Sequence, residues 1–177
     1  NICLISEEVA AKKMSLSAIA DYIADSVEAR AAKGMNFGIA VIPEGVVEFV
    51  PEFSVLIHEI NELLAGSKAD AFNALPTWED KYAFIEKGLT KESMEVFAIL
   101  PTAIQQQLFL ERDPHGNVQV SLIESEKLFS AMVADKLAAR KAAGTYKGKF
   151  SALHHFLGYE GRCAFPSNFD SDYCYSL

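Results

Sequence analysis

Two turns of the sequence hold charged side chains that could bind a small polar ligand. Glu44 lies in the turn Pro43-Glu44-Gly45, directly after the apolar run of residues 37–42, and Arg162 ends the segment Gly158-Tyr159-Glu160-Gly161-Arg162. A carboxylate fixed in a turn suits hydroxyl groups, whereas a guanidinium fork beside a phenol and open backbone amides suits a phosphate or a sugar. Without a ligand, the same residues would be an incidental Glu in a turn and an Arg paired with a neighbouring carboxylate.

Other candidate groups carry a weaker signal. Lys147 and Lys149 belong to a basic stretch, residues 136–159, which contains no carboxylate and could dock a small anion; otherwise it is the usual cationic end of a helix. His154 and His155 are adjacent, so on a strand they would point to opposite faces and could not easily share a metal ion. We expect one of them in the core and one on the surface, and no metal site. No common phosphate-donor loop or nucleophile motif occurs.

The elements that must position these groups begin with a predicted strand, helix and strand. Residues 2–5 form a short apolar run, expected to be a strand buried on both faces. A helix should follow Ser15 or Ser17 as its N-cap and end at Gly34, and residues 37–42 predict a second strand. This order predicts a right-handed unit with parallel strands.

A third strand is expected at residues 151–156. If it joins the first two in parallel, three polar segments gather at one edge of the sheet: Glu7 with Glu8, the Glu44 turn, and residues 159–162. Ligands of open α/β sheets bind at this carboxyl edge. The sequence therefore predicts an α/β fold with its binding site where the strands end.

The middle of the chain is predicted to be helical. Pro51 opens a helix whose apolar residues repeat on one face until Gly66. Further helix starts are predicted at Thr77, Thr90, Pro101 and the capping sequence Ser121-x-x-Glu124, with a long last helix over residues 123–143. We divide this single domain into residues 1–66, a helical insertion at 67–143, and residues 144–177, which hold the returning strand, the Arg162 segment and the start of a final helix.

Charge and composition disfavour several classes of protein. The 177 residues carry 24 acidic and 16 basic side chains, a formal charge of −8. Residues 1–100 hold 16 of the acidic groups and 8 of the basic ones. Nucleic-acid binding, which needs clustered cations, is therefore disfavoured. No apolar run reaches the roughly 18 residues of a membrane span, no signal peptide opens the chain, and the three cysteines lack C-x-x-C spacing. We expect a cytoplasmic protein.

Four ordered blocks of the sequence resemble one family. The blocks are Ile42-Pro43-Glu44-Gly45, residues 110–120 (LERDPHGNVQV), residues 123–128 (IESEKL), and Tyr146-Lys147-Gly148-Lys149-Phe150 with residues 158–162 (GYEGR). Spanning nearly the whole chain, they resemble the long-form pyrophosphate-dependent phosphofructokinases. This resemblance implies a phosphofructokinase-like α/β fold, with a short parallel sheet and a large helical insertion. It also implies an enzyme of glycolysis that moves a phosphoryl group from pyrophosphate to the 1-hydroxyl of fructose 6-phosphate, with magnesium.

The same resemblance implies roles for individual residues. Glu44 would contact the hydroxyls of fructose 6-phosphate. The residues that would hold the sugar phosphate are Tyr159, Glu160, Gly161 and, most directly, Arg162, while Lys147 and Lys149 could assist. The parent enzyme is expected to be a homo-oligomer.

Part of the family pattern does not occur in this sequence. The Gly-Gly-Asp phosphate-donor motif, the Thr-x-x-Asp segment with the catalytic base and the Met-Gly-Arg motif all precede the matched region. Phosphoryl transfer needs a metal, a positioned donor and a base near the attacking hydroxyl. We therefore expect an internal or C-terminal portion of the enzyme, without catalytic residues or magnesium ligands, and inactive by itself.

Two alternatives stay open. The helical region over residues 67–143 could be an assembly or regulatory module of the same enzyme, forming subunit contacts. The chain could also be a free-standing binder of sugar phosphates, which binding by the chain alone would support.

Overall fold

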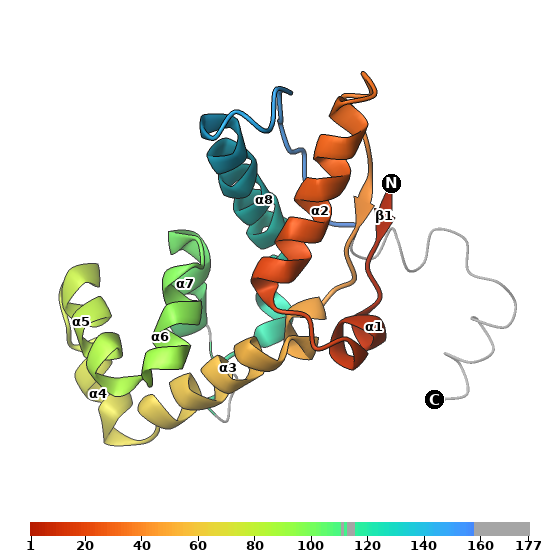
Figure 1. Ribbon diagram of the computed structural model, residues 1–177. Coiled ribbons are helices and arrows are strands. Elements are labelled where there is room, and N and C mark those ends of the chain that lie inside the picture. Colours follow the sequence, from red (N-terminus) through yellow and green to blue (C-terminus); the bar gives the residue numbers. More distant parts are fainter. Residues whose placement is uncertain (111, 113–115, 158–177) are drawn as a thin grey trace, which may run out of the picture.

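A two-stranded parallel sheet and a set of helices make up the computed structural model, which describes residues 1–110, 112 and 116–157 (Figure 1). Strands β1 (Ile2–Cys3) and β2 (Ala40–Val41) pair with Ile2 opposite Ala40. Helix α2 (Leu16–Ala31) connects them, and the Ser15 side chain caps it by accepting from the Ala18 N–H at 3.0 Å. The predicted strand, helix and strand with parallel pairing are confirmed.

The sheet is only partly covered. In β1, Ile2 is buried, whereas Cys3, on the other face, is exposed. Both residues of β2 and the residues that lead into it are exposed, with Phe37 at 76%, Ile39 at 67% and Val41 at 52%. The prediction that the first strand is buried on both faces is therefore wrong, because nothing in the described part of the chain covers this outer face.

The predicted third strand is also wrong. Residues 151–157 form no strand and are exposed, with Leu153 at 98%. Their backbone pairs with neither β1 nor β2, so the described sheet ends at β2. His154 and His155 are both exposed, which corrects the prediction that one of them is in the core.

Helix α3 (Pro51–Leu63) forms as the sequence predicts. Pro51 occupies its first turn, where a missing N–H costs no hydrogen bond. Its buried side chains recur every three or four residues, namely Phe53, Leu56, Ile60 and Leu63. This apolar face joins the sheet half of the molecule to the helices that follow (Figure 1).

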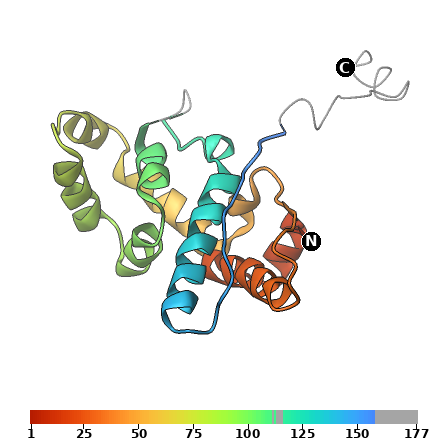
Figure 2. The same ribbon diagram turned by 90° about the horizontal axis from the view of Figure 1, so that it is seen from above.

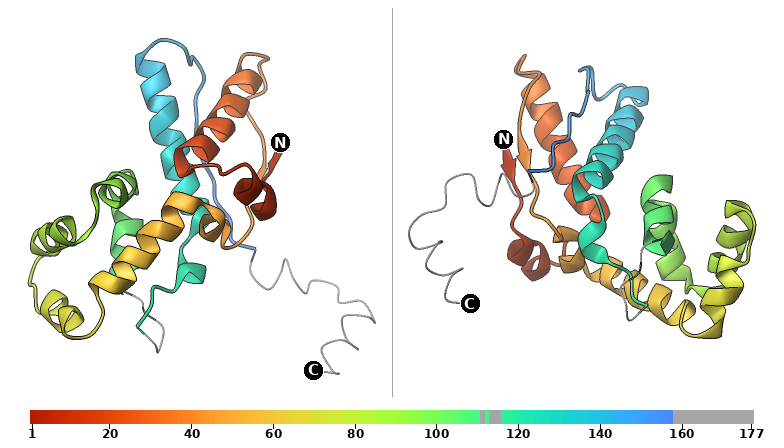
Figure 3. Two further views of the ribbon diagram at one scale, coloured as in Figure 1. Left: turned by 60° about the horizontal axis from the view of Figure 1, so that its bottom comes forward. Right: turned by 180° about the vertical axis from the view of Figure 1, so that it is seen from behind.

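Four helices follow α3 and gather at its far end, away from the sheet (Figures 1 and 3). They are α4 (Ser67–Asn73), α5 (Trp78–Gly88), α6 (Lys91–Ala98) and α7 (Thr102–Leu110). The hydroxyls of Thr77 and Thr90 cap α5 and α6 by accepting backbone N–H groups, which confirms both predicted starts. The core of this group is aromatic: Phe97 is fully buried and meets the ring of Phe109 edge-on at 5.8 Å.

Helix α8 (Ser125–Ala142) returns the chain to the sheet half and packs against α2. Its bounds lie within two residues of the predicted range. The predicted cap at Ser121 is wrong, because the short 3-10 helix η2 (Val120–Leu122) occupies that stretch and α8 begins only after Glu124. Beyond α8 the chain reverses at Gly144 and runs back alongside the helix (Figure 2).

Candidate functional site

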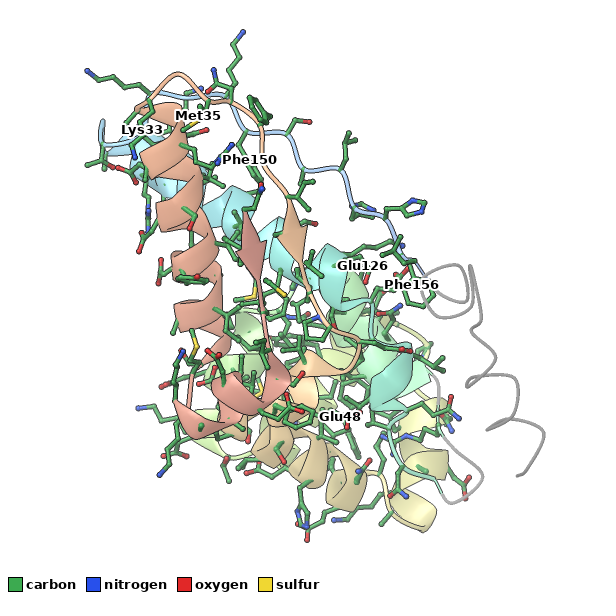
Figure 4. All side chains as sticks on the ribbon, turned by 90° about the vertical axis from the view of Figure 1, so that its right-hand side faces the viewer. Lys33, Met35, Glu48, Glu126, Phe150 and Phe156 are labelled. Atoms are coloured by element: carbon green, nitrogen blue, oxygen red, sulfur yellow. The ribbon has the colours of Figure 1, made fainter. Side chains whose placement is uncertain are left out.

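The carboxyl ends of the two strands meet at one edge of the sheet, as the sequence predicts. β1 leads into α1 (Ser6–Ala11), whose first turn holds Glu7 and Glu8, and β2 leads into the Glu44 turn. The 3-10 helix η1 (Val46–Phe49) follows this turn and packs against α1. Figure 4 shows Glu48, in η1, at the opposite end of the sheet from Lys33 and Met35, which precede β2.

The local backbone fixes the Glu44 turn. Gly45 has φ +70°, a conformation that favours glycine, and the Val46 N–H donates to the Pro43 carbonyl at 3.3 Å. Val46 and Val47 are fully buried and anchor η1 directly after the turn. Glu44 itself is exposed, so its carboxylate lies at the solvent side of a well-anchored turn.

A groove of about 630 Å³ opens beside this turn. Its walls come from η1, the first turns of α3, and residues 118–120, and its lining residues are Glu48, Phe53, Ser54, Ile57, Val118, Gln119 and Val120. Clefts of this size take small molecules. Sequence reasoning missed this groove, because η1 is only four residues long and the wall at residues 118–120 is more than 60 residues away along the chain.

The segment predicted to bind the sugar phosphate, Tyr159, Glu160, Gly161 and Arg162, lies outside the described residues. The chain that leads to it is described as far as Leu157. Figure 4 shows this part running from Phe150, near Met35, to Phe156, near Glu126 at the start of α8.

Lys147 and Lys149 lie on an anchored but exposed stretch. The side chain of Tyr146 is buried, with 4% of its surface exposed, and Phe150 is partly buried against the core. Both lysines are exposed. Phe150, the neighbour of Lys149, lies near Met35 at the end of the sheet opposite Glu48 (Figure 4). The structure therefore does not bring these two lysines to the Glu44 turn.

Two cations of the basic stretch are used within the protein. Lys136 contacts Asp21 at 2.8 Å, and Arg140 contacts Asp21, Asp25 and Glu28 at 3.3, 2.7 and 2.9 Å. The hydrogen bond from Lys136, together with the nearby cations, holds the pKa of Asp21 below its usual value. The hydrogen bond to Asp25, followed by that to Glu28, raises the pKa of Arg140. These two cations join α8 to α2. The hypothesis that the basic stretch of residues 136–159 docks a small anion therefore does not apply to Lys136 and Arg140.

Neither a metal cluster nor a membrane helix occurs in the described residues. Within residues 1–110, 112 and 116–157, no three His, Cys, Asp or Glu side chains converge to hold a metal ion. Over the same residues, no helix combines the length and the apolar character that a membrane crossing requires.

Comparison with known proteins identifies relatives along the whole chain. The chain is 51% identical over 177 residues to the pyrophosphate–fructose 6-phosphate 1-phosphotransferase of Treponema pallidum. It is equally similar, at 51% over 177 residues, to the β subunit of the protein of that name from Ricinus communis. The whole chain is homologous to one part of these proteins. An α subunit of the phosphotransferase from Arabidopsis thaliana is 40% identical over 179 residues.

The similarity to these phosphotransferases covers all of this chain but a minor part of each relative. The chain spans 31% of the Treponema protein and 30% of the Ricinus β subunit. No protein-family model matches the chain. The resemblance to pyrophosphate-dependent phosphofructokinases found in the sequence is thereby confirmed, whereas the activity of the longer phosphotransferases extends to this chain only as a proposal.

Proposed function

We propose that this chain supplies the acceptor side of a pyrophosphate-dependent phosphofructokinase, the part that binds fructose 6-phosphate. In that reaction the 1-hydroxyl of the sugar attacks pyrophosphate, giving fructose 1,6-bisphosphate and phosphate. The fold would be phosphofructokinase-like, and the parent protein would act in glycolysis in the cytoplasm. The observation that carries the proposal is the identity of about half the residues, over the whole chain, with proteins named for this reaction.

The position of Glu44 supports this assignment. It follows a parallel strand at the carboxyl edge of the sheet, where ligands of open α/β sheets bind, and its turn is anchored by the buried residues of η1. A carboxylate accepts hydrogen bonds only, so it suits the hydroxyls of a sugar and repels a phosphate. We assign the phosphate to Arg162 and Tyr159, whose guanidinium and hydroxyl groups donate hydrogen bonds.

The transfer itself also needs groups that we do not assign to this chain. Magnesium, when bound, would supply positive charge that neutralises the charge developing on the transferred phosphoryl group. We place no magnesium ligand among the described residues, where no three suitable side chains converge. This chain would bind and orient the acceptor, and the catalytic base and the pyrophosphate site would belong to the remaining length of the relatives.

Substitution of Glu44 in the full-length enzyme tests this proposal. Glu44→Gln removes the charge but keeps the shape, and charged hydrogen bonds are worth about 1.5–3 kcal/mol, so KM for fructose 6-phosphate should rise roughly tenfold or more. KM for pyrophosphate should stay within about twofold of the unchanged enzyme. Glu62→Gln is the matched control, because Glu62 is an exposed carboxylate on α3 that does not line the groove.

Arg162 gives a second test on the phosphate side. Arg162→Ala should raise KM for fructose 6-phosphate more than Glu44→Gln does, because a guanidinium can bind the doubly charged phosphate through two hydrogen bonds and alanine through none. Arg162→Lys should recover part of the loss. If Glu44→Gln and Arg162→Ala changed the oligomeric state alone, the acceptor-site assignment would be wrong.

A second candidate function is subunit assembly through the helical region over residues 67–143. The plant relatives are named as α and β subunits, which favours a parent protein of several chains. Size-exclusion chromatography of the full-length protein with charge substitutions on exposed faces of α5 and α6 would test it. A change of oligomeric state with an unchanged KM for fructose 6-phosphate would support assembly.

A further inference from the structure

We infer that the groove beside the Glu44 turn holds the sugar part of the acceptor, with Glu48 and Gln119 bonding its hydroxyls. This inference rests on the proposed function and extends it to residues with no assigned role. The ligand class is a polyhydroxylated sugar with its phosphate lying outside the groove.

The first wall of the groove is held by the core. In η1 and just beyond it, Val46, Val47 and Val50 are fully buried. Because these anchors flank Glu48, its backbone is fixed while its side chain is exposed. The backbone beneath this binding group therefore needs no ordering when a ligand arrives.

The second wall is fastened to the same helix as the first. The Asn61 side chain, on α3, accepts a hydrogen bond from the Val118 N–H at 2.9 Å. This bond ties residues 118–120 to α3, although they are far away in the sequence. Gln119 is the polar residue between the two apolar wall residues Val118 and Val120. Both walls therefore keep a fixed spacing across the groove.

Three polar side chains line the groove without using their hydrogen-bonding groups elsewhere in the described protein. The carboxylate of Glu48, the hydroxyl of Ser54 and the amide of Gln119 have no hydrogen-bond or ion-pair partner among the described residues. The half-buried side chains of Ile57 and Val120 contribute apolar surface beside these polar groups. Such a mixed lining matches a sugar, which carries hydroxyls at its rim and C–H groups on its faces.

Glu48 and Glu44 are coupled by the backbone. The Glu48 N–H donates to the Gly45 carbonyl at 2.9 Å, and the Glu48 carboxylate lies beside Gly45. The Glu48 carboxylate, which lines the groove, repels a phosphate and accepts hydrogen bonds from hydroxyls. Its charge therefore favours the neutral sugar end of a sugar phosphate in the groove, with the phosphate outside it.

Deoxy analogues of the acceptor provide the test in the full-length enzyme. The unchanged enzyme should prefer fructose 6-phosphate over an analogue that lacks the 3- or 4-hydroxyl, because such an analogue cannot donate that hydrogen bond to Glu48 or Gln119. In Glu48→Ala, this preference, measured as a ratio of kcat/KM, should shrink about tenfold for at least one analogue, which corresponds to about 1.4 kcal/mol. Gln119→Leu should shrink it as well, and KM for pyrophosphate should not change in either variant.

The controls separate this inference from the proposed function. Glu62→Ala removes an exposed carboxylate from α3 outside the groove and should leave the preference unchanged. A role of Glu48 in folding alone would lower activity toward all acceptors equally, so an unchanged ratio in folded Glu48→Ala and Gln119→Leu would overturn the inference. If Glu44→Gln still raised KM in that case, the proposed function would stand; if Glu44→Gln also had no effect, both would fall.

Discussion

The contact between α2 and α8 and the contact among α5, α6 and α7 join helices by opposite means. At the first, Lys136 and Arg140 of α8 meet three carboxylates of α2, and both cations are about a quarter exposed. At the second, the ring centre of Phe97 lies 5.8 Å from that of Tyr82 and 5.8 Å from that of Phe109. One contact is a partly wet charge network, and the other is a buried aromatic cluster.

The difference shows where the chain depends on solution conditions. Partly exposed ion pairs contribute little each and weaken with salt, whereas a buried ring contributes through its area and hardly responds to salt or pH. The sheet half should therefore loosen at low pH and high salt, while the helices at the far end of α3 should respond to loss of volume.

Phe97→Ala should have the largest effect on stability. The ring is fully buried between Tyr82 and Phe109, and deletion of a buried aromatic side chain costs about 3–5 kcal/mol. Hydrogen exchange should accelerate in α5, α6 and α7 and change little in α2. Ile99→Ala is the control, because Ile99 directly follows α6 and is 47% exposed, and it should change stability by less than about 0.5 kcal/mol.

Gly148→Ala should have the next largest effect, on the sheet half. An added Cβ would lie 2.5 Å from the Tyr146 hydroxyl oxygen and 2.7 Å from two ring carbons, so the buried ring must move, at about 1–3 kcal/mol. Thermal unfolding measures the loss. Tyr146→Phe should be neutral or slightly stabilising, because the hydroxyl is buried without a hydrogen-bond partner in the described structure. A large loss in Tyr146→Phe would contradict this packing.

Glu59→Gln should lower the free energy of unfolding by less, about 1 kcal/mol. It tests a polar contact, between α3 and the start of α6, within the half of the molecule that holds the aromatic cluster. The Glu59 carboxylate, on α3, accepts from the Thr90 N–H at 2.9 Å and from its hydroxyl at 2.8 Å. Partial burial acts to raise the pKa of Glu59, but these hydrogen bonds outweigh it and lower the pKa. Faster hydrogen exchange at the start of α6, with α8 unchanged, is the expected result.

Acid should produce the smallest effect, at the α2–α8 contact. The pKa of Asp21 is below its ordinary value of 3.8, so its contribution is fully present above about pH 4 and is lost as the pH falls through the lowered pKa. The rate of hydrogen exchange in α2 and α8 should rise as the pH falls below about 4. It should also rise when salt is added. Asp21→Asn should flatten the pH dependence; an unchanged profile would show that other carboxylates control it.

Local signals predicted much of this fold, and non-local ones did not. The caps at Ser15, Thr77 and Thr90 could be predicted because each depends on a side chain and an N–H three residues away. The expected strand at residues 151–156 failed because strand formation depends on a distant partner that no local pattern reveals.

The candidate site likewise contains residues that local sequence signals predict and residues that only the folded chain brings together. Glu44 could be singled out because its turn is encoded by neighbouring Pro and Gly. Glu48 and Gln119 were missed because only the folded chain brings η1 next to residues 118–120. The roles of Tyr159 to Arg162, and of Lys147 and Lys149, stay predictions.

The bare outer face of the sheet has a practical consequence for work with these 177 residues alone. Phe37, Ile39 and Val41 expose apolar side chains next to a strand edge, a combination that lets chains pair with one another and aggregate. Poor solubility of such a preparation would reflect this face rather than a failure to fold. Replacing Ile39 with Lys, which disfavours edge pairing, is the simplest way to obtain a soluble sample for binding measurements.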